Sequence, residues 1–367
     1  MNVAIVNWRD LEHPKAGGAE VVTDELASGL AERGHSITWF TSRHRGAASR
    51  SKRNGYVVER HGTELSCRLH AFVWLRRHRN DVDVVIDEVN TLPFFSRFAT
   101  RTPVVLWMHQ LAREIWLAEA PPIIGPIGYA VEAALLSLYR NLPLITGAPS
   151  SAASFAGLGL GNPVHVIHYP LQQPEEGNRG ESIPGRIGYV GRITPSKRVD
   201  HLVRALARVR SVVPHAELIV VGRGTRNEER SLRSLADRLG IADAVTFTGH
   251  VSSAERDAYM RSFDVLALAS LREGWGLVVS EAARFYVPSV VYPVPGLVDS
   301  VQHERSGIIT ARQDPEALCD GLLRVIQNRA LREALGVGAA DMLRGFTRER
   351  FVGAFEQFLN TQRRPGV

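Results

Sequence analysis

Two glutamates bracket a glycine-rich turn in the segment REGWGLVVSEA, which runs from Arg272 to Ala282. Glu273 precedes the turn, and Glu281 follows eight positions later within a predicted helix over 277–285. Because an α-helix rises 1.5 Å per residue, we expect the carboxylates to lie about 10 Å apart. That is too far for the acid and nucleophile of a retaining glycosidase, which are about 5–5.5 Å apart, and at the edge of the inverting range. It suits one extended ligand bound at two places.

The residues between the two glutamates favour a phosphate. Gly274 and Gly276 would expose backbone N–H groups at the start of the helix, where an anion binds well. The segment therefore predicts a site for a sugar–phosphate–ribose ligand. A surface loop followed by a glutamate on a helix face is the simpler alternative.

Two other loops contain glycine next to a predicted helix. AGGAE, residues 16–20, lets the backbone approach an anion through Gly17 and Gly18, although a plain tight turn explains it equally well. GRITPSKR, residues 191–198, follows a buried strand; Gly191 frees the backbone, while Arg192 and Lys197 could converge on one anion. Two cations at the end of a strand favour a phosphate site over a solvated basic turn.

Hydrophobic periodicity predicts the elements that position these loops. Strands are expected at VAIVN, SITWF, VDVVI, PVVLWM, PLITG and PVHVIHY in the first half, and at RIGYVG, ELIVVG, AVTFTG, DVLALA and PSVVY in the second. Helices of 9 to 15 residues are predicted between many of them, among them 19–33, 127–140, 199–213, 228–239, 253–261 and 277–285. This alternation indicates an α/β protein with parallel sheets covered on both faces. Ligands of such sheets bind beyond the carboxyl ends of the strands.

The length of 367 residues favours two domains. We expect a first domain over 1–170, a linker over 171–185 that is rich in Pro, Gly, Glu and Gln, and a second domain over 186–346. The last segment, 347–367, forms a helix that could cross back to the first domain. The start of the chain has too short an apolar run for a signal peptide, and two isolated cysteines argue against disulfides, so we expect a cytoplasmic protein.

The net charge of +6 is concentrated in one window. Residues 41–79 contain ten Lys or Arg and two Glu, a local charge of +8, which suggests a surface for an anionic partner. A helix predicted there has Leu65, Leu69, Phe72 and Val73 on one stripe and Trp74 opposite. We expect this stripe to pack in the core beneath a solvated basic face. Peripheral contact with an anionic membrane, at its inner face, and a phosphorylated acceptor are the alternatives; no nucleic-acid motif is present.

The loops GGAE, GRITPSKR and EGWGLVVSE, in this order and spacing, resemble glycosyltransferase family 4 over nearly the whole chain. WMHQLAREIW, residues 107–116, is similar to the family's segment after the fourth strand, with His109 at the position of the active-site histidine. The resemblance implies the GT-B fold, in which two Rossmann-like domains face each other across a cleft. It also implies retaining transfer of a hexose from a UDP- or GDP-sugar.

The resemblance assigns a role to each matching residue. Arg192 and Lys197 would hold the diphosphate, Glu281 the ribose and Glu273 the transferred sugar, while His109 would face that sugar. The backbone is expected to complete the donor site at the following positions: Gly17, Gly18, Gly191, Val251, Gly274, Trp275, Gly276 and Leu277. Trp275 stands where the family usually has Phe, and GAPSSAASF, residues 147–155, is less polar than in relatives, which could alter the acceptor side.

Fixed positive groups can stabilise the departing diphosphate without a cation. We therefore expect metal-independent catalysis and no cofactor beyond the nucleotide-sugar co-substrate. Asp81 and Asp83 in DVD precede a strand and are interpreted as strand-entry residues rather than metal ligands. The acceptor could be a glycan, a lipid-linked saccharide or a small metabolite. A sugar-nucleotide epimerase of the same architecture and a non-catalytic sugar-nucleotide-binding protein are the alternative functions.

Overall fold

The computed structural model describes residues 1–175 and 182–362, and the chain forms two compact units. The first comprises Met1–Arg113, Pro126–Pro170 and Phe346–Val367, and the second comprises Glu114–Gly125 and Leu171–Gly345. Residues 176–181 of the predicted linker and 363–367 of the C-terminal segment lie outside the described residues. Sequence reasoning assigned all of 1–170 to one domain, whereas the structure places residues 114–125 with the second unit.

The first unit is built on an eight-stranded sheet with the order β3-β4-β2-β1-β5-β6-β7-β8. Its strands are β1 (Asn2–Val6), β2 (Ser36–Thr41), β3 (Arg50–Arg53), β4 (Tyr56–Arg60), β5 (Val84–Glu88), β6 (Val104–Trp107), β7 (Leu144–Thr146) and β8 (Val164–Val166). All neighbours are parallel except β3 and β4. The central strands are apolar and buried, as a parallel sheet covered on both faces requires.

The antiparallel pair β3–β4 was not predicted. Its turn is Asn54-Gly55, with φ of 43° and 86°, the left-handed conformation that a two-residue hairpin turn needs. The strand RSKR has no apolar pattern because it lies at the sheet edge, so only the Asn-Gly pair could have revealed the hairpin.

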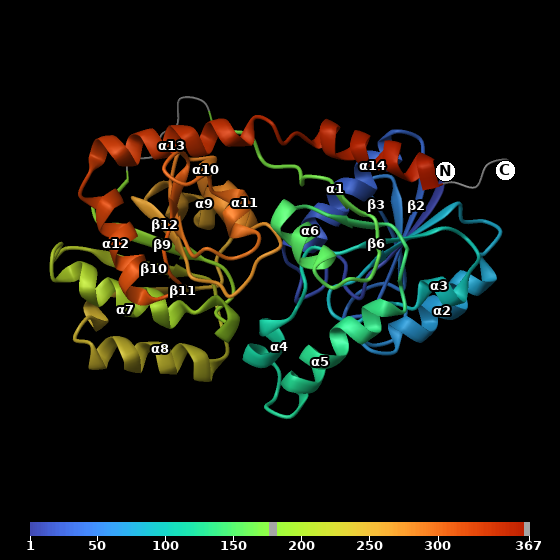
Figure 1. The fold of residues 1–367 in the computed structure, drawn as a ribbon, viewed down its shortest axis with the longest axis horizontal. Coiled ribbons are helices and arrows are strands. Elements are labelled where there is room, and N and C mark those ends of the chain that lie inside the picture. Colours follow the sequence, from blue (N-terminus) through green and yellow to red (C-terminus); the bar gives the residue numbers. More distant parts are fainter. Residues whose placement is uncertain (176–181, 363–367) are drawn as a thin grey trace. The chain divides into compact units, whose positions relative to one another are not determined.

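Helices cover both faces of this sheet (Figure 1). They are α1 (Gly18–Glu32), α2 (Cys67–Arg77), α3 (Ser96–Ala99), α5 (Ile124–Ser137), α6 (Pro149–Ala156) and the C-terminal α14 (Arg348–Gln362). In Figure 1, α1 and α14 lie on one face, and α2, α3 and α5 on the other. The C-terminal helix thus packs on α1, where Gly29 permits close approach: a Cβ there would lie 2.4 Å from Val352.

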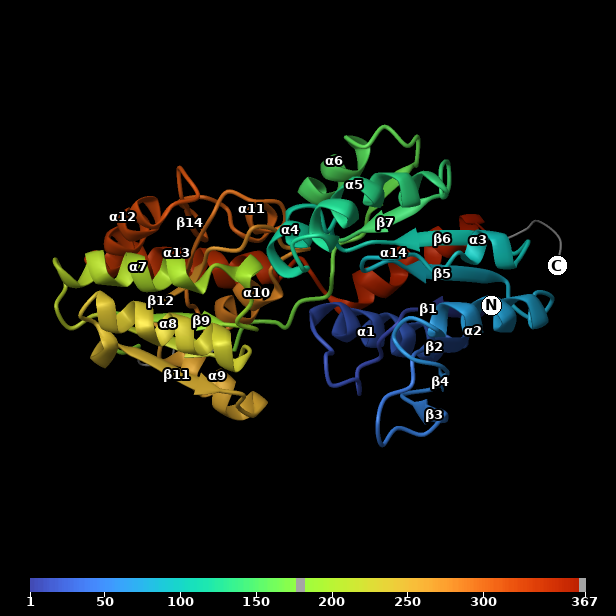
Figure 2. The ribbon, with the colours of Figure 1, turned by 90° about the horizontal axis from the view of Figure 1, so that it is seen from below.

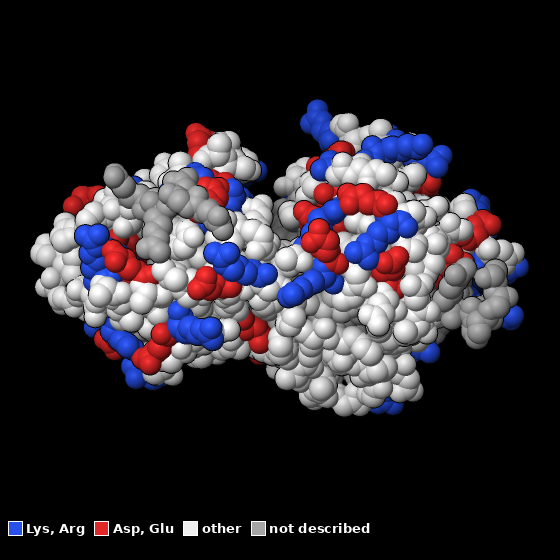
Figure 3. All heavy atoms as spheres, turned by 90° about the horizontal axis from the view of Figure 1, so that it is seen from above, with Lys and Arg blue, Asp and Glu red and all other residues white. Residues whose placement is uncertain are grey.

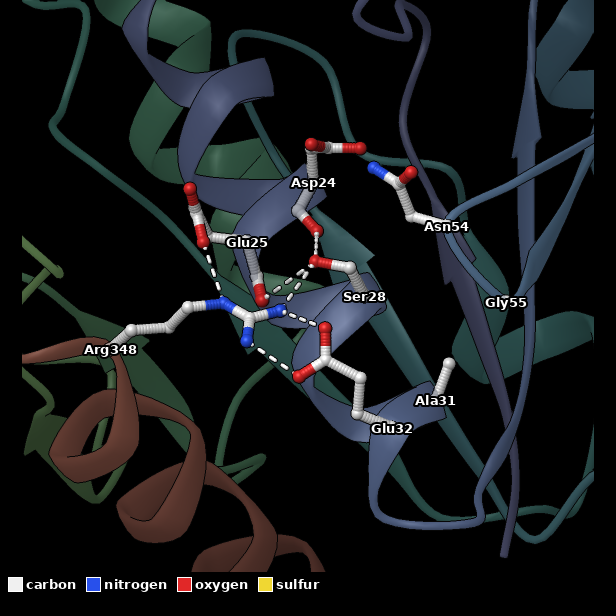
Figure 4. A pocket seen from close by; sticks show the side chains of 8 residues that line it. All are labelled: Asp24, Glu25, Ser28, Ala31, Glu32, Asn54, Gly55 and Arg348. Atoms are coloured by element: carbon white, nitrogen blue, oxygen red, sulfur yellow. Dashed lines mark hydrogen bonds and ion pairs between the residues drawn. The ribbon is translucent and has the colours of Figure 1, made fainter.

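Arg348 fastens α14 to α1. Its guanidinium contacts Glu25 at 2.8 Å, both carboxylate oxygens of Glu32 at 2.6 and 2.9 Å, and the Ser28 hydroxyl at 2.9 Å (Figure 4). An open pocket of about 600 Å³ lies beside this cluster, lined also by Asp24, Ala31, Asn54 and Gly55. The face that bears these helices carries interleaved acidic and basic side chains (Figure 3). Two acidic residues of the pocket, Glu25 and Glu32, therefore fix the C-terminal helix.

The second unit contains a six-stranded parallel sheet with the order β11-β10-β9-β12-β13-β14. Its strands are β9 (Arg186–Val190), β10 (Glu217–Val221), β11 (Val245–Gly249), β12 (Val265–Leu268), β13 (Ser289–Val291) and β14 (Gly307–Ile309). Its helices are α4 (Glu114–Glu119), α7 (Val199–Arg210), α8 (Arg226–Arg238), α9 (Ser253–Arg261), α10 (Leu277–Ala283), α11 (Leu297–Ser300), α12 (Pro315–Ile326) and α13 (Arg329–Leu343). Helices α7 and α8 cover one face of the sheet, and α10 and α13 the other (Figure 2).

Several cations of the basic window bind partners within the protein. The window is therefore less available to an anionic partner than its charge of +8 suggested. Arg60 is buried and contacts Asp10 and Glu12, which precede the window in the chain. Arg53 pairs with Asp24 at 2.9 Å, and Arg68 donates to backbone carbonyls. The exposed cations that remain include Arg43, Arg45, Arg50, Lys52, Arg76, Arg77 and Arg79.

Helix α2 buries a different face from the one predicted. Its buried residues are Cys67, Ala71 and Leu75, which belong to one core cluster with Phe40 of β2. Leu65, Leu69 and Val73 are instead 72%, 71% and 45% exposed. Trp74 lies on the half-buried side, where its ring stacks on His78 and contacts Phe40. None of the described helices combines the length and the apolar character that a bilayer span requires.

Candidate active site

Each sheet has a point where successive connections leave a strand in opposite directions. In the second unit this strand is β9, which lies between β10 and β12; in the first it is β1, between β2 and β5. Ligands of open α/β sheets bind beyond the carboxyl ends of the strands at such points. The loops after β9 and β12 carry Arg192, Lys197 and Glu273, so the fold brings these predicted residues together.

A buried tyrosine of β9 fixes the loop that follows this strand. The Tyr189 hydroxyl donates to the Arg192 carbonyl at 2.7 Å. Burial and the nearby charge of Glu273 raise the pKa of Tyr189, so it keeps its proton and remains a donor. The Arg192 side chain is exposed and makes no hydrogen bond or ion pair within residues 1–175 and 182–362. Its guanidinium is therefore available to an anionic ligand.

Lys197 and Glu273 form a direct pair that spacing alone did not predict. Lys197 Nζ lies 2.6 Å from Glu273 Oε1, and the Ser270 hydroxyl donates to the same oxygen at 2.7 Å. Both charged side chains are partly shielded, with 23% and 16% of their surface exposed. Each can therefore fix the position of the other while keeping an edge accessible to a ligand.

The loop that begins at Glu273 packs tightly against Gly296. The Glu273 N–H donates to Pro295 O at 3.1 Å, and a Cβ at Gly296 would lie only 2.3 Å from Glu273 O. Trp275 points into the interior, where its Nε1–H donates to the Ser280 hydroxyl. The tryptophan therefore anchors the turn from within, and only its backbone is placed to contact a ligand.

Replacing Gly296 by Ala should destabilise the second unit and displace Glu273. The substitution adds a backbone clash and forces an alanine to φ of +83°. Gly240 is the matched control, because its φ is +68° but nothing lies within 4 Å of an added Cβ. We expect Gly240→Ala to cost about 1–2 kcal/mol and Gly296→Ala clearly more, measured by thermal denaturation. Equal losses for both variants would contradict the role assigned to the close contact.

Glu281 lies in α10 and is half-buried. Its Oε1 is 3.7 Å from Arg256 Nη1; burial raises the pKa of Glu281, while Arg256 opposes that shift. Val251 is half-buried and packs on the core of the second unit, and Gly276 has φ of +82° just before α10. Across residues 1–175 and 182–362, no group of three or more His, Cys, Asp or Glu side chains is arranged to hold a metal ion.

Helix α4 contacts the loop after β9, a contact that the sequence did not predict. The Ser196 hydroxyl donates to Glu119, and Arg272 Nε lies 3.2 Å from Glu114 Oε2. Both carboxylates come from the segment that follows His109 in the chain. The predicted donor loops are therefore bordered by a helix whose sequence precedes α5 of the first unit.

The AGGAE loop of the first unit is fixed by its own glutamate. Glu20 is fully buried, accepts the Gly17 N–H at 2.7 Å and pairs with Arg9 at 2.9 Å. Burial raises the pKa of Glu20, and Arg9 partly offsets the effect. Gly18 is the first residue of α1. The tight turn is thus held internally at the carboxyl end of β1, beside the switch point of this sheet.

His109 follows β6, and both of its ring nitrogens contact buried side chains. Its Nε2 lies 3.1 Å from Glu88 Oε1, and its Nδ1 is hydrogen-bonded to the Tyr169 hydroxyl. Glu88 is fully buried, whereas 9% of the surface of His109 is exposed.

Asp83, one of the aspartates of DVD, lies just before β5 and accepts the Asn2 N–H at 2.7 Å.

Two family sequence models match successive parts of the chain. "Glycosyltransferase Family 4" matches residues 16–171, and "Glycosyl transferases group 1" matches residues 179–342. The chain belongs to the family 4 glycosyltransferases. This membership confirms the resemblance carried by the glycine-rich loops and the paired glutamates.

Curated relatives match part of this family 4 chain. D-inositol 3-phosphate glycosyltransferase of Stackebrandtia nassauensis is 33% identical over 223 residues, covering 56% of this chain and 50% of that protein. A GDP-mannose-dependent alpha-(1-6)-phosphatidylinositol monomannoside mannosyltransferase of Mycobacterium tuberculosis is 32% identical over 159 residues, 41% of each chain. The chain thus matches about half or less of the length of these relatives.

Solved structures share the fold at low sequence identity. Sucrose-phosphate synthase from Thermosynechococcus elongatus has a TM-score of 0.81 at 19% identity, covering 98% of both chains. Anabaena HepE in complex with UDP and glucose has a TM-score of 0.74 at 19% identity, covering 98% of this chain and 100% of that one. The fold is GT-B, as predicted.

Proposed function

We propose that this protein is a glycosyltransferase that moves a hexose from a nucleotide-diphosphate sugar to an acceptor hydroxyl in glycan, glycolipid or polysaccharide biosynthesis. One observation carries the proposal: the exposed guanidinium of Arg192 and the Lys197–Glu273 pair lie on neighbouring loops at the switch point of the second sheet. Two cations suit a diphosphate, and a carboxylate beside them suits sugar hydroxyls.

In this mechanism Arg192 and Lys197 bind the diphosphate and stabilise its charge as the glycosidic bond breaks. Glu273 positions the sugar, Glu281 binds the ribose, and the Gly274–Leu277 backbone contributes amide donors. The acceptor hydroxyl attacks from the face that the diphosphate leaves, and the departing phosphate accepts its proton. The configuration is retained, and no metal is required because the side-chain cations supply the positive charge.

Thermal denaturation with UDP, GDP, ADP and TDP, with and without EDTA, tests the donor site. A nucleotide at about 100 times its Kd should stabilise the folded state by about 2.7 kcal/mol. A shift that survives EDTA is expected for UDP or GDP. No shift with any of them would contradict the proposal, and a shift abolished by EDTA would contradict metal independence. NMR of the product tests retention, and an inverted anomer would exclude it.

Transfer itself separates this function from its two alternatives. A sugar-nucleotide epimerase would convert a labelled donor without an acceptor and release no glycoside, and a binding protein would leave the donor intact. The paired cations and carboxylates support transfer. The acceptor is a glycan, a lipid-linked saccharide or a small metabolite.

The proposed location is the cytoplasm, with peripheral contact at the inner membrane face through residues 41–79. The exposed Leu69 and Val73 of α2 and Leu65 just before it, beside the exposed Arg76 and Arg77, support this contact. Flotation with phosphatidylglycerol vesicles is the test. Equal binding to neutral phosphatidylcholine vesicles, or no binding to either, would contradict the electrostatic contact.

A further inference from the structure

A chain of hydrogen bonds crosses the carboxyl edge of the first sheet. The Thr23 hydroxyl of α1 donates to Glu88 Oε2 at 2.8 Å, and His109 Nε2 lies 3.1 Å from Glu88 Oε1. The Tyr169 hydroxyl, after β8, is bonded to His109 Nδ1. Four segments of the first unit therefore converge on one imidazole.

The chemistry of the partners fixes the proton of His109. Burial and the charge of Glu88 raise the pKa of Tyr169, so the tyrosine stays protonated and can donate to a neutral Nδ1. An ionised Glu88 can only accept hydrogen bonds, and therefore requires a hydrogen on Nε2. The same Nε2–H···Glu88 bond persists if the imidazole is protonated, because the tyrosine oxygen can then accept from Nδ1.

This arrangement is costly if it serves only packing. A fully buried carboxylate loses its hydration and is tolerated only with good partners. Within the chain of bonds, Glu88 is 0%, Thr23 0% and Tyr169 3% exposed, whereas His109 keeps 9%. The imidazole is thus the member of this network that a ligand can reach with the least rearrangement.

We propose that Glu88 is a positioning residue that orients His109 and holds a hydrogen on its Nε2, so that the ring faces the sugar or acceptor in one fixed orientation. This inference rests on the proposed transfer function. It adds a buried carboxylate of β5, outside the loops that resemble the family, to the residues that support transfer. Glu88 itself acts through His109.

The neighbouring strand residue offers a matched control. Asp87 is also fully buried in β5, but successive strand residues point to opposite faces. It accepts the Phe94 and Ser96 N–H groups and the Tyr139 hydroxyl. Asp87→Asn should thus disturb folding to a similar degree as Glu88→Gln without touching His109.

The experiment compares the rate of transfer and the ¹⁵N spectrum of the imidazoles in the wild type, Glu88→Gln, Glu88→Asp and Asp87→Asn. We expect Glu88→Gln to lower kcat by roughly 10- to 100-fold, by analogy with the lost hydrogen-bond partners of metal-ligating histidines. The His109 ¹⁵N signal should also change, because an amide does not require a hydrogen on Nε2 as a carboxylate does. The other groups around this site, Glu20 with Arg9 and Tyr169, are the same in all variants.

Glu88→Asp should restore part of the rate, while Asp87→Asn should keep the wild-type His109 signal. A wild-type kcat in Glu88→Gln, or the same change of the His109 signal in Asp87→Asn, would overturn the proposal. The ¹⁵N spectrum of the imidazoles gives a readout that does not need activity. If no donor is turned over, transfer fails; if the His109 signal is identical in wild type and Glu88→Gln, the positioning role fails independently.

Discussion

Replacing Arg192 or Lys197 by Ala is expected to reduce kcat by roughly 100- to 1000-fold. The estimate follows the loss of one donor to a developing anion in other enzymes. Arg192 is exposed, and its side chain has no hydrogen-bond or ion-pair partner among the described residues, so its removal should leave the fold intact. Lys197 also holds Glu273, so its removal should affect the sugar contact as well.

Release of the nucleoside diphosphate, measured against donor concentration, provides the rates. Arg329→Ala is a suitable control, since that side chain is 82% exposed and pairs, among the described residues, with Glu333 one helical turn away. Full activity in both Arg192→Ala and Lys197→Ala would refute the diphosphate site.

A double substitution separates the two roles of Lys197. If the lysine acts mainly by holding Glu273, Lys197→Met combined with Glu273→Gln should be no slower than the slower single variant. If it binds phosphate directly, the effects should add. The first result would leave Arg192 as the side chain that binds the diphosphate directly.

The second large effect concerns stability: Arg60→Ala should lower the free energy of unfolding of the first unit by about 3–5 kcal/mol. Only 1% of the Arg60 side chain is exposed, and it contacts Asp10, Glu12 at 2.9 Å and Ser51 at 2.9 Å. Asp10 is 2% exposed, so the substitution leaves its charge buried without its main partner.

Urea denaturation followed by tryptophan fluorescence measures this loss, because four of the six tryptophans lie in the first unit. Arg50→Ala is the control from the same basic window; its side chain is 70% exposed and 3.6 Å from Glu59. We expect the control to change stability by less than about 0.5 kcal/mol. Similar losses in both variants would show that Arg60 is a surface charge in solution.

The sequence predicted what depends on local periodicity. Apolar runs of four to six residues that alternate with helical patterns can bury both faces only in a parallel sheet, so the strands from Asn2 to Val291 were largely found, apart from β3 and β4; β14 was not predicted. The loops that follow β9 and β12 came with them, because a strand end and its glycine are neighbours in the chain. The Asn54-Gly55 pair is also a local signal for a hairpin, but the hairpin was missed because its polar edge strand has no apolar pattern.

Tertiary structure decided which charges meet. Lys197 and Glu273 are 76 positions apart, and Thr23 and Glu88 are 65 apart, so no local spacing encodes either contact. The burial of Arg60 and the outward stripe of α2 likewise follow from which face meets the sheet, since a basic amphipathic sequence can pack either way. The chain by itself determined the family and the fold, and it predicted the donor loops. Packing decided which side chains pair, because the free energy of a charge depends on the partners and the solvent around it.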